Sequence, residues 1–426
     1  MKKTEKKSQK KVIICCFLAG MNEMYDFVIF GLLASIIHKQ YLSFANDSNS
    51  LFITYALFSV GFAFRPIGAI VFGYIGDVHG RKLSLVTSVT MMGTASLTMC
   101  LMPTYESIGI VSCYMIAIAR ITQGFSVGGE MTGGVVYAIE HFDKKKSGFA
   151  GSFVIGGCLS GILLATIVAN IIQLPSMPKY AWRFAFLLGF LLSLVGFFIR
   201  QKLTESPEFA SIKSKSKLPL LDGLKECKLE SITSVLIGAS CGTNIYFAVV
   251  FIPVYLKTLI GENLSYLSII TTLVMAVMSP FFGWVSDHTH RGVLIMAGAV
   301  LSSIYALMML PLIMANQSTI AICLVIALHS FIYSIQDGTI CVFSAEIFPV
   351  KYRYSCAAFC QSVGIGIIGG ASPMISTLIA ENFSDPNFIL GLYVSAVTLI
   401  AGIAVGLTVN KRRKESILTL INAVEL

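Results

Sequence analysis

The chain has 426 residues, of which 55% are hydrophobic and 12% are charged, and its formal net charge is +9. A water-soluble protein carries about 25% charged residues, so this composition excludes an ordinary soluble enzyme. The apolar residues lie in long uninterrupted blocks, and we therefore expect an all-α, polytopic membrane protein.

Twelve apolar segments follow one another along the chain. At about 1.5 Å per residue, each is long enough to cross the roughly 30 Å hydrocarbon layer of a bilayer as a helix. Little sequence remains between them for a separate soluble domain. The segments occupy residues 12–37, 51–76, 84–103, 107–140, 147–173, 182–201, 231–257, 264–286, 292–315, 318–345, 353–382 and 387–410.

Lysine and arginine lie mainly on one side of these spans. If the N-terminus is cytoplasmic, that side holds 25 of the 31 basic residues, whereas Arg65 and Arg120 lie within spans. This asymmetry predicts that both termini are cytoplasmic and that the basic loops face anionic lipid headgroups. The positive net charge thus predicts an orientation in the membrane and not a nucleic-acid partner.

The first span holds two acidic residues, Glu23 and Asp26, and Asn22 shares their face of the helix. A carboxylate at the bilayer centre costs about 2.5–3.5 kcal/mol on insertion scales, so each is a functional candidate. We predict that these carboxylates carry a proton or contact a substrate. The alternative is a permanent salt bridge that only packs the helices together.

Two arginines lie inside spans and require a nearby anion, because a guanidinium stays charged. Arg120 lies near the middle of the fourth span, with Gln123 and Glu130 on the same broad side of the helix. Its partner is either an acidic residue of the first span or a substrate carboxylate, and competition between the two would couple solute binding to proton binding. Arg65, in the second span, is either a second cation of the site or a partner in helix–helix pairing.

The longest polar stretch divides the twelve spans into six and six. Residues 201–230 are rich in lysine and serine, which is typical of a solvated linker. We therefore predict an N-terminal six-helix bundle at 1–201, a cytoplasmic linker at 202–230 and a C-terminal six-helix bundle at 231–426.

The tenth span carries a stripe of polar residues, formed by His329, Tyr333 and Gln336, with Asp337 beside it. Polar side chains in a span usually face the protein interior or a water-filled cavity. We predict that Gln336 and Asp337 contact the substrate or a proton. Tyr333, like Tyr25 in the first span, could receive a quaternary ammonium group through a cation–π contact, although aromatic residues at helical spacing also serve as packing.

The two halves repeat short patterns at nearly the same offset, which indicates a duplicated six-span unit. Residues 136–142, which include Glu140, resemble residues 342–348, which include Glu346. The loop after the second span has a degenerate copy after the eighth span; the two are Gly73-x3-Asp77-x2-Gly80-Arg81-Lys82 and Gly283-x3-Asp287-x3-Arg291.

Five segments together resemble the metabolite:proton symporter family of the major facilitator superfamily, whose members carry proline/betaine, ketoglutarate, citrate or shikimate. They are residues 73–82, 23–27 (Glu-Met-Tyr-Asp-Phe), 65–68 (Arg-Pro-Ile-Gly), 120–130 (Arg-x2-Gln-Gly-x3-Gly-Gly-Glu) and 345–355 (Ala-Glu-Ile-Phe-Pro followed by Arg-Tyr-Ser). Two positions depart from the family pattern. Met24 stands where the family usually has Trp, and residues 336–338 stand where a Tyr-Gly-Pro-like sequence is common.

This resemblance implies the major facilitator fold, with two pseudo-symmetric bundles of six helices around a central cavity. In that fold spans 1, 4, 7 and 10 line the cavity, which adds Asn244 and Tyr246 of the seventh span to the candidate site. The resemblance also implies that the loops after the second and eighth spans gate the cavity as the halves rock. The expected gating residues are Gly73, Asp77, Gly80, Arg81, Lys82, Glu130, Glu140, Asp287, Arg291, Glu346 and Arg353.

The function expected from these features is proton-coupled import of a small organic solute by alternating access, in a bacterial inner membrane. One buried arginine facing several carboxylates favours a zwitterion such as proline, betaine or another amino acid. An organic acid of the ketoglutarate, citrate or shikimate type is the alternative. An efflux antiporter and a non-transporting receptor are further alternatives.

We expect neither an enzyme nor a cofactor-dependent protein. The glycine-rich segments do not follow a strand or end in Lys-Ser/Thr, so no ATP-binding loop is predicted. The cysteine spacing gives no metal motif. The expected partners are the solute, protons and the lipid bilayer, and the expected oligomeric state is a monomer.

Overall fold

The structure is a computed structural model that describes residues 2–41, 47–212, 216–261, 264, 266–316 and 318–424. Within these ranges every regular element is helical. The part of the linker at 213–215 lies outside the described residues.

The N-terminal half contains six long helices and two short ones. The break between α1 and α2 at Leu33 shortens the first predicted span, which was expected to run to residue 37. The helices are α1 (Lys2–Leu32), α2 (Ala34–Tyr41), α3 (Asp47–Val78), α4 (Arg81–Leu101), α5 (Tyr105–Ile108), α6 (Ile110–Glu140), α7 (Ser147–Ile172) and α8 (Trp182–Gln201).

The C-terminal half repeats this order after two short linker helices, α9 (Pro207–Ala210) and α10 (Pro219–Glu226). Two of its spans are built from several pieces. Its elements are α11 (Lys228–Tyr246), η1 (Phe247–Phe251), α12 (Ile252–Ile260), α13 (Tyr266–Ser286), α14 (Arg291–Ala315), α15 (Thr319–Glu346), α16 (Arg353–Gln361), η2 (Ser362–Gly369), α17 (Ser372–Asn382) and α18 (Pro386–Val424).

The helices are long and apolar enough to cross a membrane. Eleven such segments occur among the described residues, each with a mean hydropathy of at least 1.3 over an 18-residue window. The remaining predicted span, 51–76, lies within α3, and its side chains from 51 to 59 are outside the described residues. The all-helical, membrane-spanning fold class predicted from the sequence is thus the one observed.

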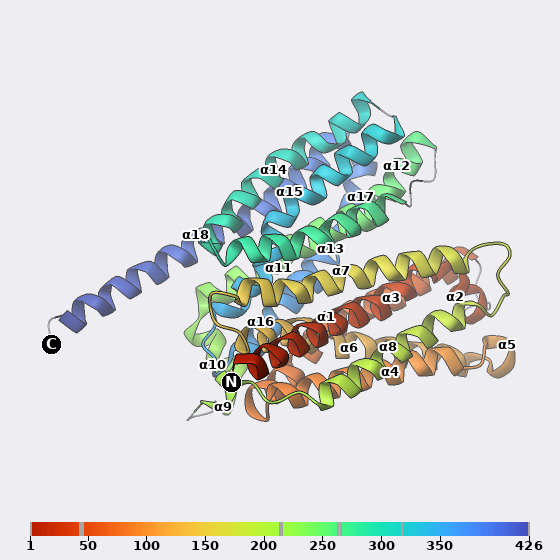
Figure 1. Ribbon diagram of the computed structural model, residues 1–426. Coiled ribbons are helices and arrows are strands. Elements are labelled where there is room, and N and C mark those ends of the chain that lie inside the picture. Colours follow the sequence, from red (N-terminus) through yellow and green to blue (C-terminus); the bar gives the residue numbers. More distant parts are fainter. Residues whose placement is uncertain are drawn as a thin grey trace.

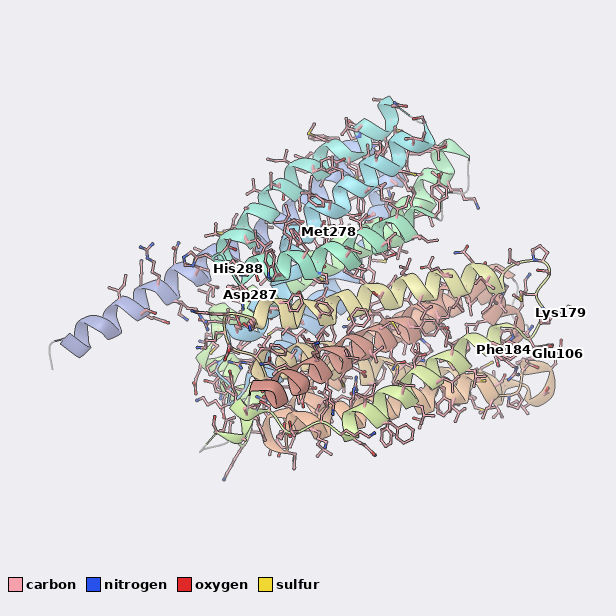
Figure 2. The ribbon with its side chains drawn as sticks, in the orientation of Figure 1. Glu106, Lys179, Phe184, Met278, Asp287 and His288 are labelled. Atoms are coloured by element: carbon pink, nitrogen blue, oxygen red, sulfur yellow. The ribbon has the colours of Figure 1, made fainter. Side chains whose placement is uncertain are left out.

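The helices form two bundles that meet at one end of the molecule and diverge toward the other (Figure 1). We call the end that carries α9 and α10 the linker end, and the end that carries α2, α5 and α12 the opposite end. Asp287 and His288 lie at the linker end, and Glu106 and Lys179 lie at the opposite end (Figure 2).

Glycine allows helices within each half to approach closely, which is how helices associate where lipid removes the hydrophobic driving force. A Cβ atom on Gly157 or Gly161 of α7 would press into the backbone carbonyls of Phe17 and Met21 on α1. The repeat-related pair, α11 and η2, makes the same kind of contact. The glycine-rich runs at 156–161 and 364–370 are therefore packing surfaces.

The halves contact each other along two seams. One joins α7 to α13, where a Cβ on Gly156 would lie 2.7 Å from Pro280 Cγ. The other joins α3 to α16 and η2, where a Cβ on Gly73 would lie 2.6 Å from Ser355 Cα. Residues beside both seams, Ile155 of α7 and Ile365 of η2, line the cavity described below.

Two predicted spans that read as single helices contain a π-helical turn. The π-helix η1 directly precedes Pro253, and η2 precedes Pro373. A proline has no backbone N–H and clashes with the preceding turn, so the helix widens locally to satisfy its carbonyls. Both π-helices lie next to the space between the halves, because Tyr246, directly before η1, and Ile365 of η2 line the cavity described below.

Candidate functional site

An enclosed cavity lies between the two halves. Its volume is about 50 Å³, which is enough for several water molecules. Its walls come from α1, α6 and α7 of the N-terminal half and from α11, α15 and η2 of the C-terminal half. The lining residues are Met24, Val28, Met131, Ile155, Cys158, Leu159, Ile162, Cys241, Gly242, Ile245, Tyr246, Asp337, Cys341 and Ile365.

Asp337 is the one charged side chain among the described residues that line this cavity. It is fully buried, and its Oδ2 accepts a hydrogen bond of 2.6 Å from the Ser279 hydroxyl. Its Oδ1 faces the Cys241 thiol at 3.8 Å. Neutral donors therefore hold this carboxylate toward the cavity, and a cationic ligand group there would be attracted to it.

Tyr246 is the aromatic residue of the cavity wall. Its ring packs edge-on against Phe62 of the other half, with centroids 5.5 Å apart. An aromatic ring face is a favourable contact for an ammonium group. Tyr246 and Asp337 are the two predicted site residues that the structure brings together at the cavity.

A loose ion pair, Glu23 with Arg65, joins α1 to α3. Arg65 Nη2 and Glu23 Oε1 are 3.8 Å apart, and the side chains are 2% and 0% exposed. Both oxygens of Glu23, and Nε and Nη1 of Arg65, are buried without a hydrogen-bond partner in the described part of the chain. Arg65 therefore pairs with a neighbouring helix, which is one of the two roles considered for it. Most of the N–H donors of Arg65 nevertheless have no partner among the described residues.

The other polar residues of the first span point into the N-terminal bundle. Tyr25 donates a hydrogen bond of 2.9 Å to the Ala185 carbonyl of α8, and Asn22 donates one of 2.9 Å to Ser193 of the same helix. Asp26 also faces α8, since a Cβ on Gly189 would overlap Asp26 Oδ1. Tyr25, Asp26 and Asn22 are accordingly not among the residues that line the cavity.

Arg120 and Gln123 lie in the same interior. Arg120 Nη1 donates to Gln123 Oε1 at 2.9 Å, and its guanidinium lies over the rings of Phe27 and Phe30, 5.0 and 4.3 Å from their centroids. Gln123 in turn donates to Ser96 of α4 at 3.2 Å. The structure places Arg120 within electrostatic reach of Asp26 but not at the cavity wall.

The remaining candidates of the C-terminal half also lie off the cavity. Asn244 donates a hydrogen bond of 2.9 Å to Thr398 of α18. Tyr333 and Gln336 are buried, and the Tyr333 hydroxyl and Gln336 Nε2 have no hydrogen-bond partner among the described residues. Only Asp337 of the tenth-span group lines the cavity.

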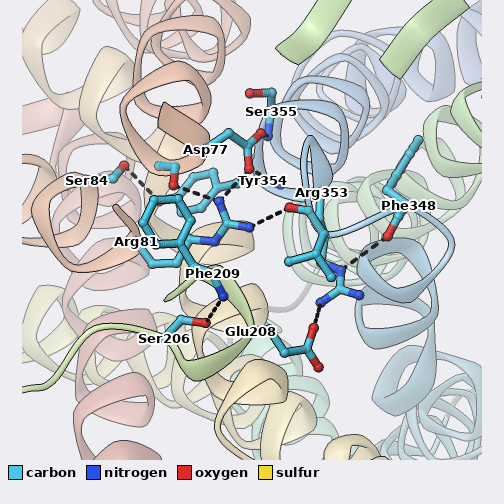
Figure 3. A network of polar contacts seen from close by, with 12 residues as sticks. Asp77, Arg81, Ser84, Ser206, Glu208, Phe209, Phe348, Arg353, Tyr354 and Ser355 are labelled. Atoms are coloured by element: carbon cyan, nitrogen blue, oxygen red, sulfur yellow. Dashed lines mark hydrogen bonds and ion pairs between the residues drawn. The ribbon is translucent and has the colours of Figure 1, made fainter. Parts of the chain in front are cut away.

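The first predicted gating loop is closed at the linker end (Figure 3). Arg81 Nη1 is 2.5 Å from Asp77 Oδ1, and Arg81 Nη2 is 3.2 Å from Glu140 Oε1 and 2.9 Å from the Val350 carbonyl of the other half. Arg353 also binds Glu140, at 3.2 Å. Arg81, Glu140 and Arg353 thus hold the two halves together.

Asp77 makes a second contact across the halves, at the first turn of α16. Its Oδ2 accepts a hydrogen bond of 2.8 Å from the Ser355 N–H, and its Oδ1 accepts one of 3.3 Å from the Tyr354 N–H. A carboxylate at a helix N-terminus satisfies unpaired N–H groups and opposes the positive end of the helix dipole. Asp77 therefore caps a helix of the C-terminal half.

The second predicted gating loop repeats this arrangement with the halves exchanged. Asp287 Oδ1 and Oδ2 accept hydrogen bonds from the N–H groups of Gly148 and Phe149, at 2.7 and 2.8 Å, in the first turn of α7. Arg291 pairs with Asp287 at 2.8 Å and with Glu346. We call the two clusters the first and second latch.

The latches obey the same offset that the sequence repeats show. Asp287 and Arg291 follow Asp77 and Arg81 by 210 positions, and Glu346 follows Glu140 by 206. The capped N–H groups keep the second offset, since 354 and 355 follow 148 and 149 by 206. The duplicated sequence thus builds two equivalent contacts between the halves.

The two glycines of the first loop occupy positions that a larger residue could not take without strain. Gly73 lies against Ser355, where a side chain would meet the backbone of α16. Gly80 has a φ of 133°, which L side chains rarely adopt, in the turn that joins α3 to α4. Lys82 is instead peripheral, since its ammonium donates to the Gln201 carbonyl at 2.8 Å.

Glu130 is placed away from both latches. Its Oε1 accepts a hydrogen bond of 2.6 Å from Arg200 Nη2, and both residues are buried inside the N-terminal half. Arg200 is not among the residues that the sequence singles out. A buried partner at the end of α8 has no distinctive sequence signal, because the residue also fits a basic span end.

The linker, which the sequence predicts to be solvated, contributes residues that contact the first latch. Glu205 accepts hydrogen bonds from the N–H groups of Arg81 and Lys82, at 3.0 and 3.3 Å, and so caps α4. Ser206 donates to Glu140 at 2.5 Å, and Glu208 pairs with Arg353 at 2.6 Å. The signal available was Ser206-Pro207-Glu208, a helix-start pattern directly after the sixth span.

The linker is also tied to the C-terminal half. The Tyr352 hydroxyl donates a hydrogen bond to Glu226, and Lys351 Nζ lies 3.3 Å from the same carboxylate. These two donors lower the pKa of Glu226 below its usual value. The end of α10 is thereby attached to the loop that precedes α16.

Comparison with known proteins was consistent along almost the whole chain. Residues 12–405 match the sequence model of the Major Facilitator Superfamily. A proline/betaine transporter of Salmonella typhimurium is 27% identical over 428 residues, covering 95% of this chain and 85% of the relative. A proline/betaine transporter of Escherichia coli K12 is 27% identical over 422 residues, covering 94% and 83%.

Solved structures give the same fold. The proton:xylose symporter XylE bound to 6-bromo-6-deoxy-D-glucose superposes with a TM-score of 0.77 at 16% identity, covering 94% of this chain and 95% of XylE. The inward-open form of XylE from E. coli superposes with a TM-score of 0.64, also at 16% identity. The predicted resemblance to the superfamily is confirmed by the family match.

Proposed function

The chain belongs to the Major Facilitator Superfamily, and we propose that it is a proton-coupled symporter that imports a small zwitterionic solute. The superfamily has twelve membrane-spanning helices in two halves, and secondary transporters with such repeats rock one half against the other around a midplane site. The cavity between the halves is the site that this motion would expose to each side in turn.

The composition of the cavity wall is the observation that supports a zwitterionic solute. Asp337 supplies one negative charge, and apolar, thiol and aromatic side chains supply the rest. A cationic amine or quaternary ammonium group is attracted to such a wall, whereas a dicarboxylate or tricarboxylate is repelled. Proline and betaine, which name the two bacterial relatives described above, both carry one cationic nitrogen and one carboxylate.

We propose that the linker end faces the cytoplasm of a bacterial inner membrane. Most lysines and arginines lie in loops at this end, in accord with the positive-inside rule. Both latches are closed there, so we assign the conformation as one shut toward the cytoplasm. The transporter would act as a monomer and without ATP.

The proton gradient is a sufficient energy source for accumulation. Each elementary charge that moves down 100 mV releases about 2.3 kcal/mol, and each 1.4 kcal/mol corresponds to a tenfold concentration ratio. One proton per solute at roughly 150 mV therefore supports accumulation of a neutral zwitterion by a few hundred-fold.

The test is uptake by purified protein in proteoliposomes under an imposed pH gradient. Labelled proline, betaine, ketoglutarate, citrate and shikimate form the panel. We expect accumulation of proline or betaine that collapses when a protonophore is added. Accumulation of the organic acids alone would select the organic-acid symporter, and binding without flux would select a receptor.

The direction of flux has a separate test. Right-side-out and inside-out membrane vesicles are compared under gradients of the same size, and import predicts solute entry with protons into right-side-out vesicles. Solute movement against the proton flux would instead identify an efflux antiporter.

A further inference from the structure

The Glu23–Arg65 pair differs from the other buried ion pairs of the protein. Arg81 with Asp77 and Arg200 with Glu130 are hydrogen-bonded at 2.5 and 2.6 Å. Glu23 and Arg65 are 3.8 Å apart, beyond hydrogen-bond distance, although both are buried. A buried pair is stable only when additional hydrogen bonds satisfy its remaining donors and acceptors, so this one is left costly.

The donor atoms of the pair that have no hydrogen-bond partner among the described residues are suited to bind an anionic ligand. Arg65 Nε and Nη1 are buried donors without a partner in the described part of the chain, and a carboxylate is the anion whose geometry a guanidinium fork fits. Both oxygens of Glu23 are likewise buried without a hydrogen-bond partner there. A proton on Glu23 would remove its charge at little cost once Arg65 had another anion.

Neither residue of the pair lines the cavity, but both lie close to residues that do. A Cβ on Gly366 of η2 would lie 3.6 Å from Arg65 Cδ, and the neighbouring residue Ile365 lines the cavity. The cavity residues Tyr246 and Cys158 lie within electrostatic reach of both Arg65 and Glu23. Arg120, by contrast, is enclosed by Phe27, Phe30 and Gln123 inside the N-terminal half.

We propose that Arg65 binds the carboxylate of the transported solute and that Glu23, released from Arg65, accepts the co-transported proton. This inference rests on the proposed function and names the residues that couple its two ligands. In the solute-free state Arg65 neutralises Glu23 and leaves Asp337 as the one net negative charge of the site. With a zwitterion bound, its carboxylate pairs with Arg65, its cationic nitrogen faces Asp337, and the proton on Glu23 makes the loaded site neutral.

Other charged and titratable groups surround Glu23. Each of these residues must be left unmutated when the protonation of Glu23 is tested. They are Arg65 of α3, Glu130 of α6, Cys158 of α7, Arg200 of α8 and Tyr246 of α11. Glu130 and Arg200 neutralise each other, so the charged neighbour of Glu23 whose pairing changes when a solute binds is Arg65.

The first test measures proton uptake on solute binding by purified protein in weakly buffered detergent solution, with a pH indicator. The probe is whichever of proline, betaine, ketoglutarate, citrate and shikimate the wild type accumulates, and all five carry a carboxylate. We expect about one proton per bound solute in the wild type and none in Glu23→Gln. In proteoliposomes Glu23→Gln should exchange internal for external solute yet fail to accumulate it.

The second test measures solute affinity. Arg65→Gln should raise the dissociation constant of the probe at least tenfold, and Arg65→Lys should restore part of the affinity by restoring the charge. For a betaine probe, choline is the matched ligand, because it keeps the quaternary ammonium and lacks the carboxylate. Choline has no carboxylate for Arg65 to bind. We therefore expect choline to displace bound betaine from the wild type no better than from Arg65→Gln.

Lys179→Gln, an exposed change at the opposite end, controls for loss of one positive charge, and thermal unfolding in detergent controls for folding. Normal affinity in Arg65→Gln, or accumulation with one proton taken up by Glu23→Gln, would overturn the inference while the transport function stands. If Arg65→Gln is unfolded, the choline comparison on the wild type decides, since strong competition by choline contradicts a carboxylate contact. Absence of uptake by the wild type for all five solutes would remove the proposed function and the inference with it.

Discussion

The buried charged residues of this protein are distinguished by how completely their hydrogen bonds are satisfied. Arg81, Arg200 and Asp77 have several partners each, and such groups hold structure together. Both oxygens of Glu23, and Nε and Nη1 of Arg65, have no hydrogen-bond partner among the described residues, whereas Asp337 is held by neutral donors. Since a buried polar atom without a partner is costly in a low-dielectric interior, Glu23 and Arg65, like Asp26, have hydrogen bonds to gain, whereas Asp337 offers an already solvated charge at the cavity wall.

Replacing Asp337 with Asn tests the cation site directly. Asn keeps the size and the contact with Ser279 but removes the charge, so a cationic nitrogen loses a charge-assisted contact worth about 1.5–3 kcal/mol. The half-saturation concentration for uptake of proline, whose ammonium N–H groups can donate to this carboxylate, should rise by roughly 10- to 100-fold. The measurement is initial-rate uptake in proteoliposomes under a fixed pH gradient.

The control for this change is Asp385→Asn, an identical substitution at an exposed site. It should leave the half-saturation concentration within experimental error. An unchanged half-saturation concentration in Asp337→Asn, together with loss of accumulation, would instead mark Asp337 as a proton carrier.

The sequence identified the charged residues within spans but not the direction in which each points. Glu23 and Asp26 are three positions apart on one broad face of α1, yet Glu23 reaches Arg65 on α3 and Asp26 faces Gly189 on α8. In a bundle, most faces of a central helix are buried against protein, so hydrophobic periodicity carries no information about which neighbour each face meets. This is why the sequence leaves the partners of both Arg120 and Arg65 open.

At the scale of elements, the contact between α7 and α13 is built around a glycine. A Cβ on Gly148 would lie 2.5 Å from the Gly283 carbonyl oxygen and 2.6 Å from Asp287 Oδ1. Gly148→Ala should therefore prevent the second latch from closing and shift the protein toward the form open at the linker end. Spin labels at 145 and 288, both exposed, should report a longer distance across this seam.

Gly134→Ala is the matched control, because the nearest atom to its Cβ would be Val154 Cγ1 at an ordinary 3.4 Å. Each variant adds one methyl group to a buried helical glycine, so a difference in the distance distribution reflects the seam. Identical spin-label distance distributions for Gly148→Ala and the wild type would contradict this prediction. They would show that neighbouring atoms shift to accommodate the added methyl group while the seam stays closed.

The end of α6 predicts a pH effect on stability. His141 is half-buried, with Nδ1 2.8 Å from the Tyr137 carbonyl, and its Nε2 is buried without a hydrogen-bond partner in the described part of the chain. Burial lowers the pKa of His141 below 6.5, because protonation would place a proton on Nε2 with no acceptor. As the pH falls through 6.5, the unfolded chain gains a proton that the folded chain resists, so stability declines.

His141→Gln, which stays neutral, should reduce this decline. The measurement is the apparent melting temperature in detergent at pH 7.5 and pH 5.5, and the difference between the two should be smaller in the variant than in the wild type. An equal difference in both proteins would mean that other groups dominate the acid sensitivity.

Element positions were largely predictable, whereas breaks within elements were not. The apolar blocks located the long helices because twenty consecutive apolar residues have few other stable arrangements. The break at Leu33 and the π-helices before Pro253 and Pro373 escaped prediction. Proline signals a local disturbance, but whether a helix kinks, widens or ends there depends on the neighbours that satisfy the freed carbonyls.

At the scale of the whole molecule, the duplicated sequence makes closure at the linker end a sum of two contributions. The first latch joins α3 to α16 and the second joins α13 to α7. The described residues of the two latches do not overlap, and each places an aspartate on the first turn of a helix in the opposite half. Contributions from sites without shared partners are usually additive.

Asp77→Asn and Asp287→Asn test this additivity. Each removes a carboxylate that accepts two backbone N–H bonds and pairs with an arginine, so each should destabilise the closed form by about 1–2 kcal/mol. The double variant should lose about 2–4 kcal/mol, which is a shift of roughly 30- to 1,000-fold toward the open form. Spin-label distances at 145 and 288 give the populations, with Asp385→Asn as the control. If the double variant matches one single variant, that latch alone determines closure, and the symmetry of the sequence is not a symmetry of the gate.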